Sequence, residues 1–242
     1  INSLSDDQVL MIVSDHGHTM RPPRAVFINE ILRRHGFLKT RKGRIPLVNT
    51  VALIEKSKNA FLRLMQQLDL EDEVYRLARM LPKSKRQSLK TSSYATTRQE
   101  SLAWVSDLGG GTSFSGIEIN RALCSQMQLN YENLRREIIG LLTPLTDSRG
   151  NRLFRWIKPR EEVFQGNQVD KYPDIVFELA PGYGVERTLY CGITGTSATH
   201  KKVSGGHSKY GVFILRTKDK VAFDEKLHIT QVFSIIRQIL EV

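Results

Sequence analysis

The chain has 242 residues, a formal net charge of +11 and a hydrophobic fraction of 40%, which is enough for a core in one large α/β domain or two small ones. The positive charge is local, because residues 1–98 carry 18 Lys and Arg against 9 Asp and Glu, whereas the remainder carries 18 against 16. A local basic surface suits anionic partners such as phosphate esters, nucleic acid or anionic lipid, although a solvated basic face explains it equally well.

Cysteine content and hydropathy exclude several classes of protein. Cys124 and Cys191 are far apart in the sequence, so neither a disulfide framework nor a zinc ribbon is present. No apolar run approaches the roughly 20 residues of a membrane span, and no signal peptide is visible. We therefore expect a cytoplasmic protein. The first residue is Ile1 rather than Met, from which we expect a piece of a longer protein.

The first half of the chain predicts one strand followed by helices. Residues 9–13 are apolar without alternation, which predicts a fully buried strand. Apolar residues then recur at helical spacing over 25–36, where Gly36 ends the helix. A second helical pattern covers 48–80. Residues 82–101 are polar and basic, and they are typical of an exposed connection.

The second half alternates strands with helices. The predicted elements are a short strand at 116–120, an amphipathic helix at 130–145, a turn at 147–151, a strand running into a short helix or turn at 153–164, buried strands at 173–180 and 210–216, and a closing helix at 228–240. This alternation predicts an α/β layered fold in which helices flank a mostly parallel central sheet.

Asp15 and His16 come directly after the first predicted strand. Sites in open α/β sheets form beyond the carboxyl ends of strands, and zinc accepts both carboxylate and imidazole ligands at about 2.0–2.2 Å. Neighbouring residues of a regular strand point to opposite faces, but a turn at Gly17 would let both side chains converge on one ion. Alternatively, the Asp-His-Gly triplet is a strand-end turn that carries an incidental histidine.

His207 is the second candidate metal ligand. It follows Gly205 and Gly206 and precedes another predicted buried strand, and small residues around a histidine let backbone and ligand approach closely. The alternative is a glycine-rich loop with a solvent-facing histidine. His18 could lie in the second shell of the same site. We assign structural or surface roles to the remaining histidines, which are His35, His200 and His228.

Other catalytic motifs are absent. The three glycines 109–111 are not followed by the Lys-Ser/Thr pair of a phosphate-binding P-loop. The Gly-x-Ser-x-Gly elbow of the α/β-hydrolases does not occur either.

Taken in order, several segments resemble the alkaline phosphatase superfamily, and most closely its type I phosphodiesterase/nucleotide pyrophosphatase group. The first is "VLMIVSDHGH" (9–18), a buried strand that ends in Ser-Asp-His-Gly. "SGGHSKYGVFIL" (204–215) is similar to the closing metal-histidine loop of that group. The segments between them also match in order: "FINEILRRHGFL" (27–38), "GIEIN" (116–120), and "REEVFQG" with "PDIVFEL" (160–166 and 173–179). The resemblance covers nearly the whole chain.

The resemblance implies a two-metal phosphoric ester hydrolase that acts on a small phosphate ester. The metals would be two divalent ions, usually zinc, with manganese as an alternative. Asp15 and His16 would bind one ion and His207 the other. In that family the remaining ligands and a Thr or Ser nucleophile lie upstream of the Asp-His-Gly turn, so no catalytic nucleophile is assigned in this chain, and the substrate-binding residues are not assigned.

On this interpretation residues 1–242 form the carboxyl-terminal portion of a phosphodiesterase domain that lacks its amino-terminal half, with a basic insertion or loop near 82–101. One Asp and one His are too few to hold zinc tightly, since catalytic sites take three protein ligands and a water. We therefore expect the isolated chain to be inactive and to bind metal weakly or not at all.

Three alternatives stay open. A sulfatase-like or phosphoglycerate-mutase-like member of the same superfamily would share the fold. A non-catalytic basic module would bind nucleic acid or another anionic surface through residues 1–98, although no nucleic-acid motif is recognisable. A family member that has lost its catalytic activity would keep the fold and serve as a scaffold.

Overall fold

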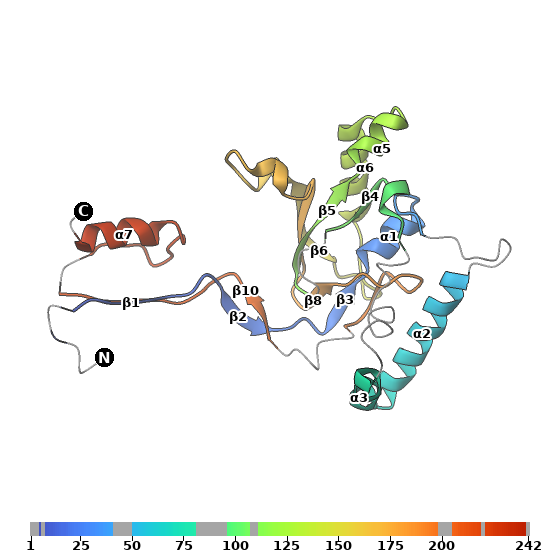
Figure 1. Cartoon of the computed structure of the whole chain (residues 1–242), viewed down its shortest axis with the longest axis horizontal. Coiled ribbons are helices and arrows are strands. Elements are labelled where there is room, and N and C mark those ends of the chain that lie inside the picture. Colours follow the sequence, from blue (N-terminus) through green and yellow to red (C-terminus); the bar gives the residue numbers. More distant parts are fainter. Residues whose placement is uncertain are drawn as a thin grey trace. The chain divides into compact units, whose positions relative to one another are not determined.

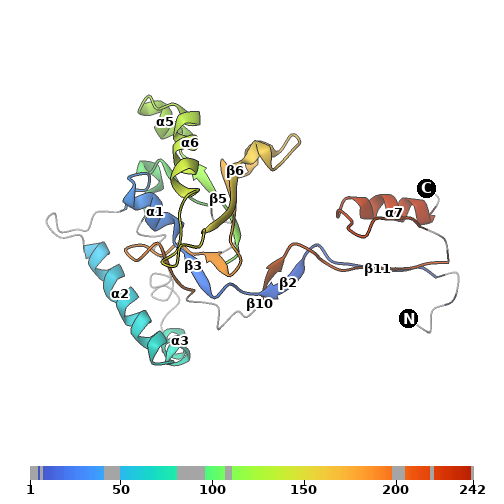
Figure 2. The ribbon, with the colours of Figure 1, turned by 180° about the vertical axis from the view of Figure 1, so that it is seen from behind.

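The computed structural model describes residues 5, 8–40, 50–80, 96–106, 111–197, 205–218 and 221–240. They belong to two compact units (Figures 1 and 2). The smaller unit combines the two ends of the sequence, Ile1–Met20 and Gly205–Val242, and the larger unit comprises Arg21–Ser204. Asp15, His16 and His207 all belong to the smaller unit.

The smaller unit is an antiparallel ribbon of two chain segments with a helix after it. The amino-terminal segment contributes β1 (Leu10–Val13) and β2 (Gly17–Met20). The carboxyl-terminal segment contributes β10 (Gly205–Ser208) and β11 (Phe213–Arg216), followed by α7 (Gln231–Leu240). Strand β1 pairs with β11, and β2 pairs with β10 (Figure 1).

The expectation that 9–13 and 210–216 are buried strands is wrong. Ile12 is 44% exposed, Ile214 is also 44% exposed, and Val212 is 53% exposed. The reason is that, among the described residues, β1 and β11 pair only with each other. A two-stranded ribbon cannot bury both of its faces. In helix α7 of the same unit, Ile235 is buried whereas Phe233 stays exposed.

The described residues of the larger unit form two sheets. A four-stranded sheet has the order β4-β5-β7-β6, and a three-stranded sheet has the order β8-β3-β9. The strands are β3 (Arg24–Val26), β4 (Ala103–Val105), β5 (Phe114–Ile119), β6 (Phe154–Pro159), β7 (Ile175–Leu179), β8 (Tyr183–Val185) and β9 (Thr194–Thr196).

The predicted parallel central sheet is wrong, although the mixed α/β class is confirmed. All three pairings of the four-stranded sheet are antiparallel, and among the described strands only β3 and β8 run parallel. Alternation of strands and helices did not imply parallel crossovers here. After β5, two helices lead to β6, which lies at the edge of the sheet. The chain then reverses, so β7 lies between β5 and β6 and pairs antiparallel with both.

The helices of the larger unit are α1 (Ile28–Arg34), α2 (Thr50–Gln67), α3 (Glu71–Met80), α5 (Arg121–Gln126) and α6 (Tyr131–Leu142). Asn120 and Asn130 cap α5 and α6, each side-chain oxygen accepting a hydrogen bond from the backbone N–H three residues on. Short 3₁₀ turns cover Arg98–Glu100, Arg160–Glu162 and Val169–Lys171.

Most of the predicted helices are confirmed. Helix α1 ends before Gly36, whose φ of +83° is the left-handed conformation that glycine tolerates. The single helical pattern over 48–80 is two helices, α2 and α3, between which Asp69 has a φ of +57°. Of the predicted connection at 82–101, residues 82–95 lie outside the described part. Residue Ser101 is fully buried rather than exposed.

The core lies in the larger unit, where α1 contacts β4 and α6 contacts β6. Its residues share full or nearly full burial and come from both sheets and both helices; they include Val26, Ile31, Leu32, Ala103, Val105, Ile117, Leu134, Ile138, Leu142, Ile175, Phe177 and Leu179. The prediction of a buried strand at 173–180 is therefore confirmed. Among the described helices, none has the length and hydropathy that a membrane crossing requires.

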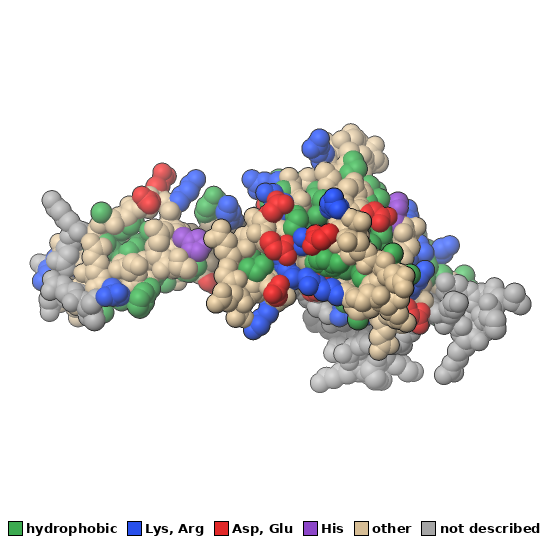
Figure 3. Space-filling model, turned by 90° about the horizontal axis from the view of Figure 1, so that it is seen from above, with side chains coloured by type: hydrophobic (Ala, Val, Ile, Leu, Met, Phe, Trp, Pro, Cys, Tyr) green, Lys and Arg blue, Asp and Glu red, His purple; other side chains and the backbone are tan. Residues whose placement is uncertain are grey.

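Buried charges in the larger unit are paired with opposite charges. Asp174 is 4% exposed and accepts hydrogen bonds from the Ile119 backbone N–H (2.7 Å), the Tyr131 hydroxyl (2.7 Å), Arg121 (3.0 Å) and Arg160 (3.3 Å). Figure 3 shows basic and acidic side chains side by side on one face of this unit. These arginines therefore serve the fold. Seven Lys and Arg without any Asp or Glu fall in 41–49 and 81–95, outside the described residues.

Candidate functional site

The predicted metal corner lies where the two segments of the ribbon pass from one strand pair to the next. Ser14 fixes this crossing. Its backbone N–H donates to the Val212 carbonyl (3.0 Å), and its hydroxyl oxygen accepts from the Val212 N–H (2.8 Å). Asp15 and His16 follow in an irregular segment between β1 and β2. The strand alternation is interrupted there, so both side chains can lie close together.

Two glycines let the segments approach at this crossing. A Cβ atom at Gly17 would overlap the carbonyl oxygen of Tyr210, and one at Gly211 would lie 2.5 Å from the Ser14 hydroxyl oxygen. Glycine is therefore required at position 17 by the close approach of the two backbones, rather than by the turn that the sequence predicts.

His16 is held in one orientation by the backbone of the next residue. Its Nδ1 lies 3.0 Å from the Gly17 carbonyl oxygen, so in the neutral ring Nδ1 carries the proton and donates it there. The lone pair is then on Nε2, which lies 3.6 Å from Oδ1 of Asp15. A backbone carbonyl that fixes the tautomer of an imidazole in this way is the usual support of a metal-ligating histidine.

The separation of these two atoms fits a shared ion better than a direct contact. At 3.6 Å, Nε2 and Oδ1 are too far apart for a hydrogen bond. Two ligands at about 2.0–2.2 Å from a tetrahedral zinc ion lie roughly 3.3–3.5 Å apart. Asp15 is 84% exposed and His16 34%, so an ion could enter between them. Without a metal ion, the two side chains would form only a loose ion pair, and only when the imidazole is protonated.

His207 lies next to His16, as the family resemblance predicts. The ring centres of His16 and His207 are 4.3 Å apart, with the rings nearly perpendicular. His207 is on β10, so the ribbon brings together residues about 190 positions apart in the sequence. Among the described residues, however, no group of three or more His, Cys, Asp or Glu side chains is arranged to hold a metal ion. The chain provides close pairs of donors rather than a finished coordination shell.

His18, which the sequence places in the second shell at most, also lies at this corner. It lies directly opposite His207 in the β2–β10 register, and its ring centre is 5.3 Å from that of His16.

The other histidines lie elsewhere. The exposed His35 follows the end of α1, and Nδ1 of His228 lies 2.8 Å from the Thr230 hydroxyl just before α7. His200 and the glycines 109 and 110 are outside the described residues.

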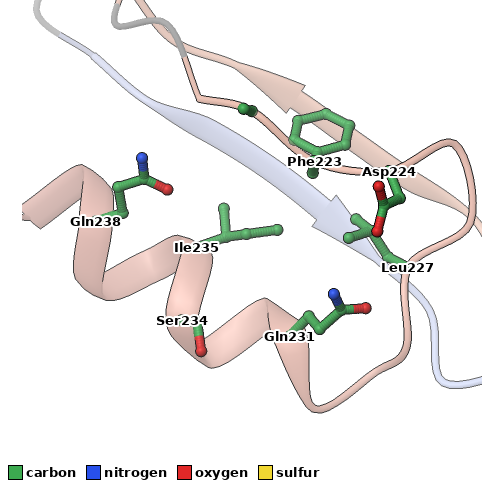
Figure 4. Close-up of a pocket in the computed structure, with 8 residues that line it drawn as sticks. Phe223, Asp224, Leu227, Gln231, Ser234, Ile235 and Gln238 are labelled. Atoms are coloured by element: carbon green, nitrogen blue, oxygen red, sulfur yellow. The ribbon is translucent and has the colours of Figure 1, made fainter.

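A separate pocket of about 440 Å³ lies in the same unit between α7 and the preceding segment (Figure 4). The lining side chains are a mixture of apolar and polar groups, Ala222, Phe223, Asp224, Leu227, Gln231, Ser234, Ile235 and Gln238. They include one carboxylate and no histidine or cysteine, so this pocket does not offer a metal site.

Comparison with known proteins adds no assignment. The sequence matches no family model, and the comparisons with curated proteins and with solved structures give no match.

Proposed function

We propose that this chain is part of a two-metal hydrolase of phosphoric esters, similar to the phosphodiesterase/nucleotide pyrophosphatase group. The observation that supports it best is the approach of His207 to His16, whose Nε2 in turn lies near the Asp15 carboxylate. The sequence resemblance assigns these three residues to neighbouring metal ions, and their side chains lie together in one unit.

Each residue has a role that its position supports. Asp15 supplies negative charge, and Nε2 of His16 supplies a lone pair whose direction is fixed by the hydrogen bond from Nδ1 to Gly17. His207 comes from the opposite strand and would serve the second ion. When bound, two such ions stabilise the attacking and leaving oxygens of a phosphoryl centre. These residues are too few for two complete shells, so further ligands and a Thr or Ser nucleophile are needed from outside the residues assigned here.

The test is a hydrolysis assay on a protein that extends these 242 residues by their upstream segment, in Zn²⁺ or Mn²⁺. Three chromogenic substrates separate the alternatives: bis(p-nitrophenyl) phosphate for a phosphodiesterase, p-nitrophenyl phosphate for a phosphatase, and p-nitrophenyl sulfate for a sulfatase. We expect the diester to be preferred, and we expect Asp15→Asn and His207→Ala each to lower kcat/KM at least about a hundredfold. The control variant His35→Phe should retain activity.

The proposal fails if none of the three substrates is hydrolysed, or if hydrolysis survives His207→Ala. The 242-residue chain alone should show no turnover. Turnover by the isolated chain that His207→Ala abolishes would instead show that the ligand set assigned here is already sufficient.

A further inference from the structure

Helix α2 of the larger unit carries a stripe of large apolar side chains that faces solvent. The stripe consists of five residues that are each between 49% and 64% exposed, Leu53, Ile54, Phe61, Leu64 and Leu68. Ile54, Phe61 and Leu68 are spaced by seven residues, so each lies within about 20° of the one before around the helix. Leu68 follows the last residue of α2, and its N–H still donates to the Leu64 carbonyl (3.0 Å). A continuous stripe of this kind differs from the single apolar residues that are normal on a protein surface.

The opposite side of α2 is the side that packs on the larger unit. Asn59 is 9% exposed, and its amide NH₂ donates to the Leu189 carbonyl (3.0 Å). Its side chain points about 160° away from that of Phe61 around the helix. Helix α3, which lies beside α2 (Figure 1), exposes Leu77 and Met80 as well. Among the described residues, none of the hydrophobic core comes from α2 or α3, so the rest of the unit does not bury the stripe.

The sequence around this helix pair is strongly basic. Residues 41–95 carry 12 Lys and Arg against 5 Asp and Glu, which accounts for most of the net charge of +11 of the whole chain. Seven of these basic residues fall in 41–49 and 81–95, the segments of sequence that flank the two helices, and neither segment contains Asp or Glu. Positive charge and an exposed apolar stripe therefore occur together in one part of the chain.

This combination selects among the partners that could cover the stripe. A second copy of the chain would bring the same positive charge, so like charges oppose self-association through this surface. A nucleic acid would neutralise the charge, but its backbone offers phosphates and sugars rather than an apolar layer to α2. An anionic bilayer surface offers both, because its headgroups attract Lys and Arg and its acyl boundary takes up Leu, Ile and Phe side chains.

We propose that α2 and α3 dock on the surface of an anionic lipid bilayer, with the apolar stripe of α2 inserted at the boundary between headgroups and acyl chains. The positive charge of this part of the sequence supplies the attraction to the headgroups. Stable attachment to a membrane surface takes two such signals, apolar insertion and basic charge. The helices lie on the bilayer in this arrangement, since none of the described helices could cross it. The interaction uses the larger unit alone, so it does not depend on the histidine corner or on hydrolase activity.

The experiment is co-sedimentation of the 242-residue chain, and of the upstream-extended protein, with vesicles of phosphatidylcholine that contain about 30% phosphatidylserine. We expect both proteins to bind, with affinity at least about tenfold lower for vesicles of phosphatidylcholine alone and at least about tenfold lower when NaCl is raised from about 0.1 to about 0.5 M.

Two substitutions separate insertion of the stripe from simple charge attraction. The double variant Phe61→Gln, Leu64→Gln removes two exposed apolar side chains, keeps good or comparable helix formers and leaves the charge unchanged, so it should weaken binding at least about tenfold. The matched control Met127→Gln removes an exposed apolar side chain elsewhere in the larger unit and should bind as the unaltered chain does.

A second measurement uses the unaltered chain, so it does not depend on how a variant folds. Amide hydrogen exchange in α2 should slow when the anionic vesicles are added, whereas exchange in α6 should not change. The proposal is overturned if the anionic vesicles do not bind, if the double variant binds as tightly as the unaltered chain, or if exchange in α2 is unaffected.

Two further outcomes would identify a different partner and also overturn the proposal. Binding by the 242-residue chain but not by the upstream-extended protein would show that the upstream segment covers the stripe. Binding to single-stranded DNA but not to the vesicles would show that the basic charge serves a nucleic acid.

Discussion

Replacing the buried Asp174 by Asn tests whether the arginines of the larger unit are structural. The change keeps the shape of the side chain but removes its charge and turns an amide NH₂ toward groups that donate hydrogen bonds. Tyr131 and the backbone of Ile119 both donate to this carboxylate at 2.7 Å, and Arg160, itself 4% exposed, pairs with it at 3.3 Å. The substitution leaves the buried Arg160 with one compensating charge fewer.

Removing one partner of a buried ion pair costs about 3–5 kcal/mol. The other carboxylates near Arg160, those of Glu161 and Asp170, offset part of this loss, so we expect the lower end, about 3 kcal/mol. With a urea m-value of about 2 kcal/mol/M for a unit of this size, the unfolding midpoint should fall by about 1.5 M.

The assay is urea unfolding of the full chain, followed by tryptophan fluorescence and circular dichroism. The matched control is Arg155→Gln, which removes a 3.0 Å ion pair with Glu178 in which the Arg155 side chain is 63% exposed. Its free energy of unfolding should change by less than about 1 kcal/mol. If Asp174→Asn also costs less than about 1 kcal/mol, the network does not stabilise the fold as argued, and its arginines become available for an anionic partner.

Three further predictions concern Gly17, Tyr131 and Cys191. In the upstream-extended protein, Gly17→Ala should weaken Zn²⁺ binding without unfolding the larger unit, because its Cβ would overlap the Tyr210 carbonyl oxygen; calorimetry that shows unchanged affinity would contradict this. Burial and the hydrogen bond to Asp174 raise the pKa of Tyr131 to about 12 from an ordinary value of 10.0. The folded state therefore holds this proton more tightly, so the stability that Tyr131 contributes is complete below pH 10 and is lost as the pH rises toward 12, and in Asp174→Asn its phenolate absorbance should appear at lower pH. Burial raises the pKa of Cys191 to about 12, so iodoacetamide at pH 8 should label it in urea but hardly at all in the native chain; fast native labelling would show that the thiol is accessible and ionised.

The sequence was most informative where one short pattern decides the local structure. The run "PDIVFEL" predicted a buried strand and Gly36 predicted the end of a helix, and both are confirmed. Helix α6 also begins and turns its apolar face inward as its spacing predicted. Such features depend on backbone propensity and burial within a few neighbouring residues, which a single sequence contains.

Sheet direction and strand burial depend on distant partners, and there the prediction was wrong. The continuous apolar run at 9–13 is typical of a central strand. Strand β1, however, pairs with only one described strand, so Ile12 is exposed. The approach of His207 to His16 was predicted only through the family resemblance, because no local pattern relates positions about 190 residues apart. The position of His18 opposite His207 likewise depends on the register of β2 and β10, which no local pattern gives.

Crystals of the upstream-extended protein, soaked in Zn²⁺ and measured at the zinc absorption edge, would test the central claim most directly. The account predicts an anomalous peak in the smaller unit, about 2.0–2.2 Å from both Nε2 of His16 and a carboxylate oxygen of Asp15, with the His207 ring beside it. Zinc bound elsewhere on the chain, or a peak that neither Asp15 nor His16 contacts, would contradict the account.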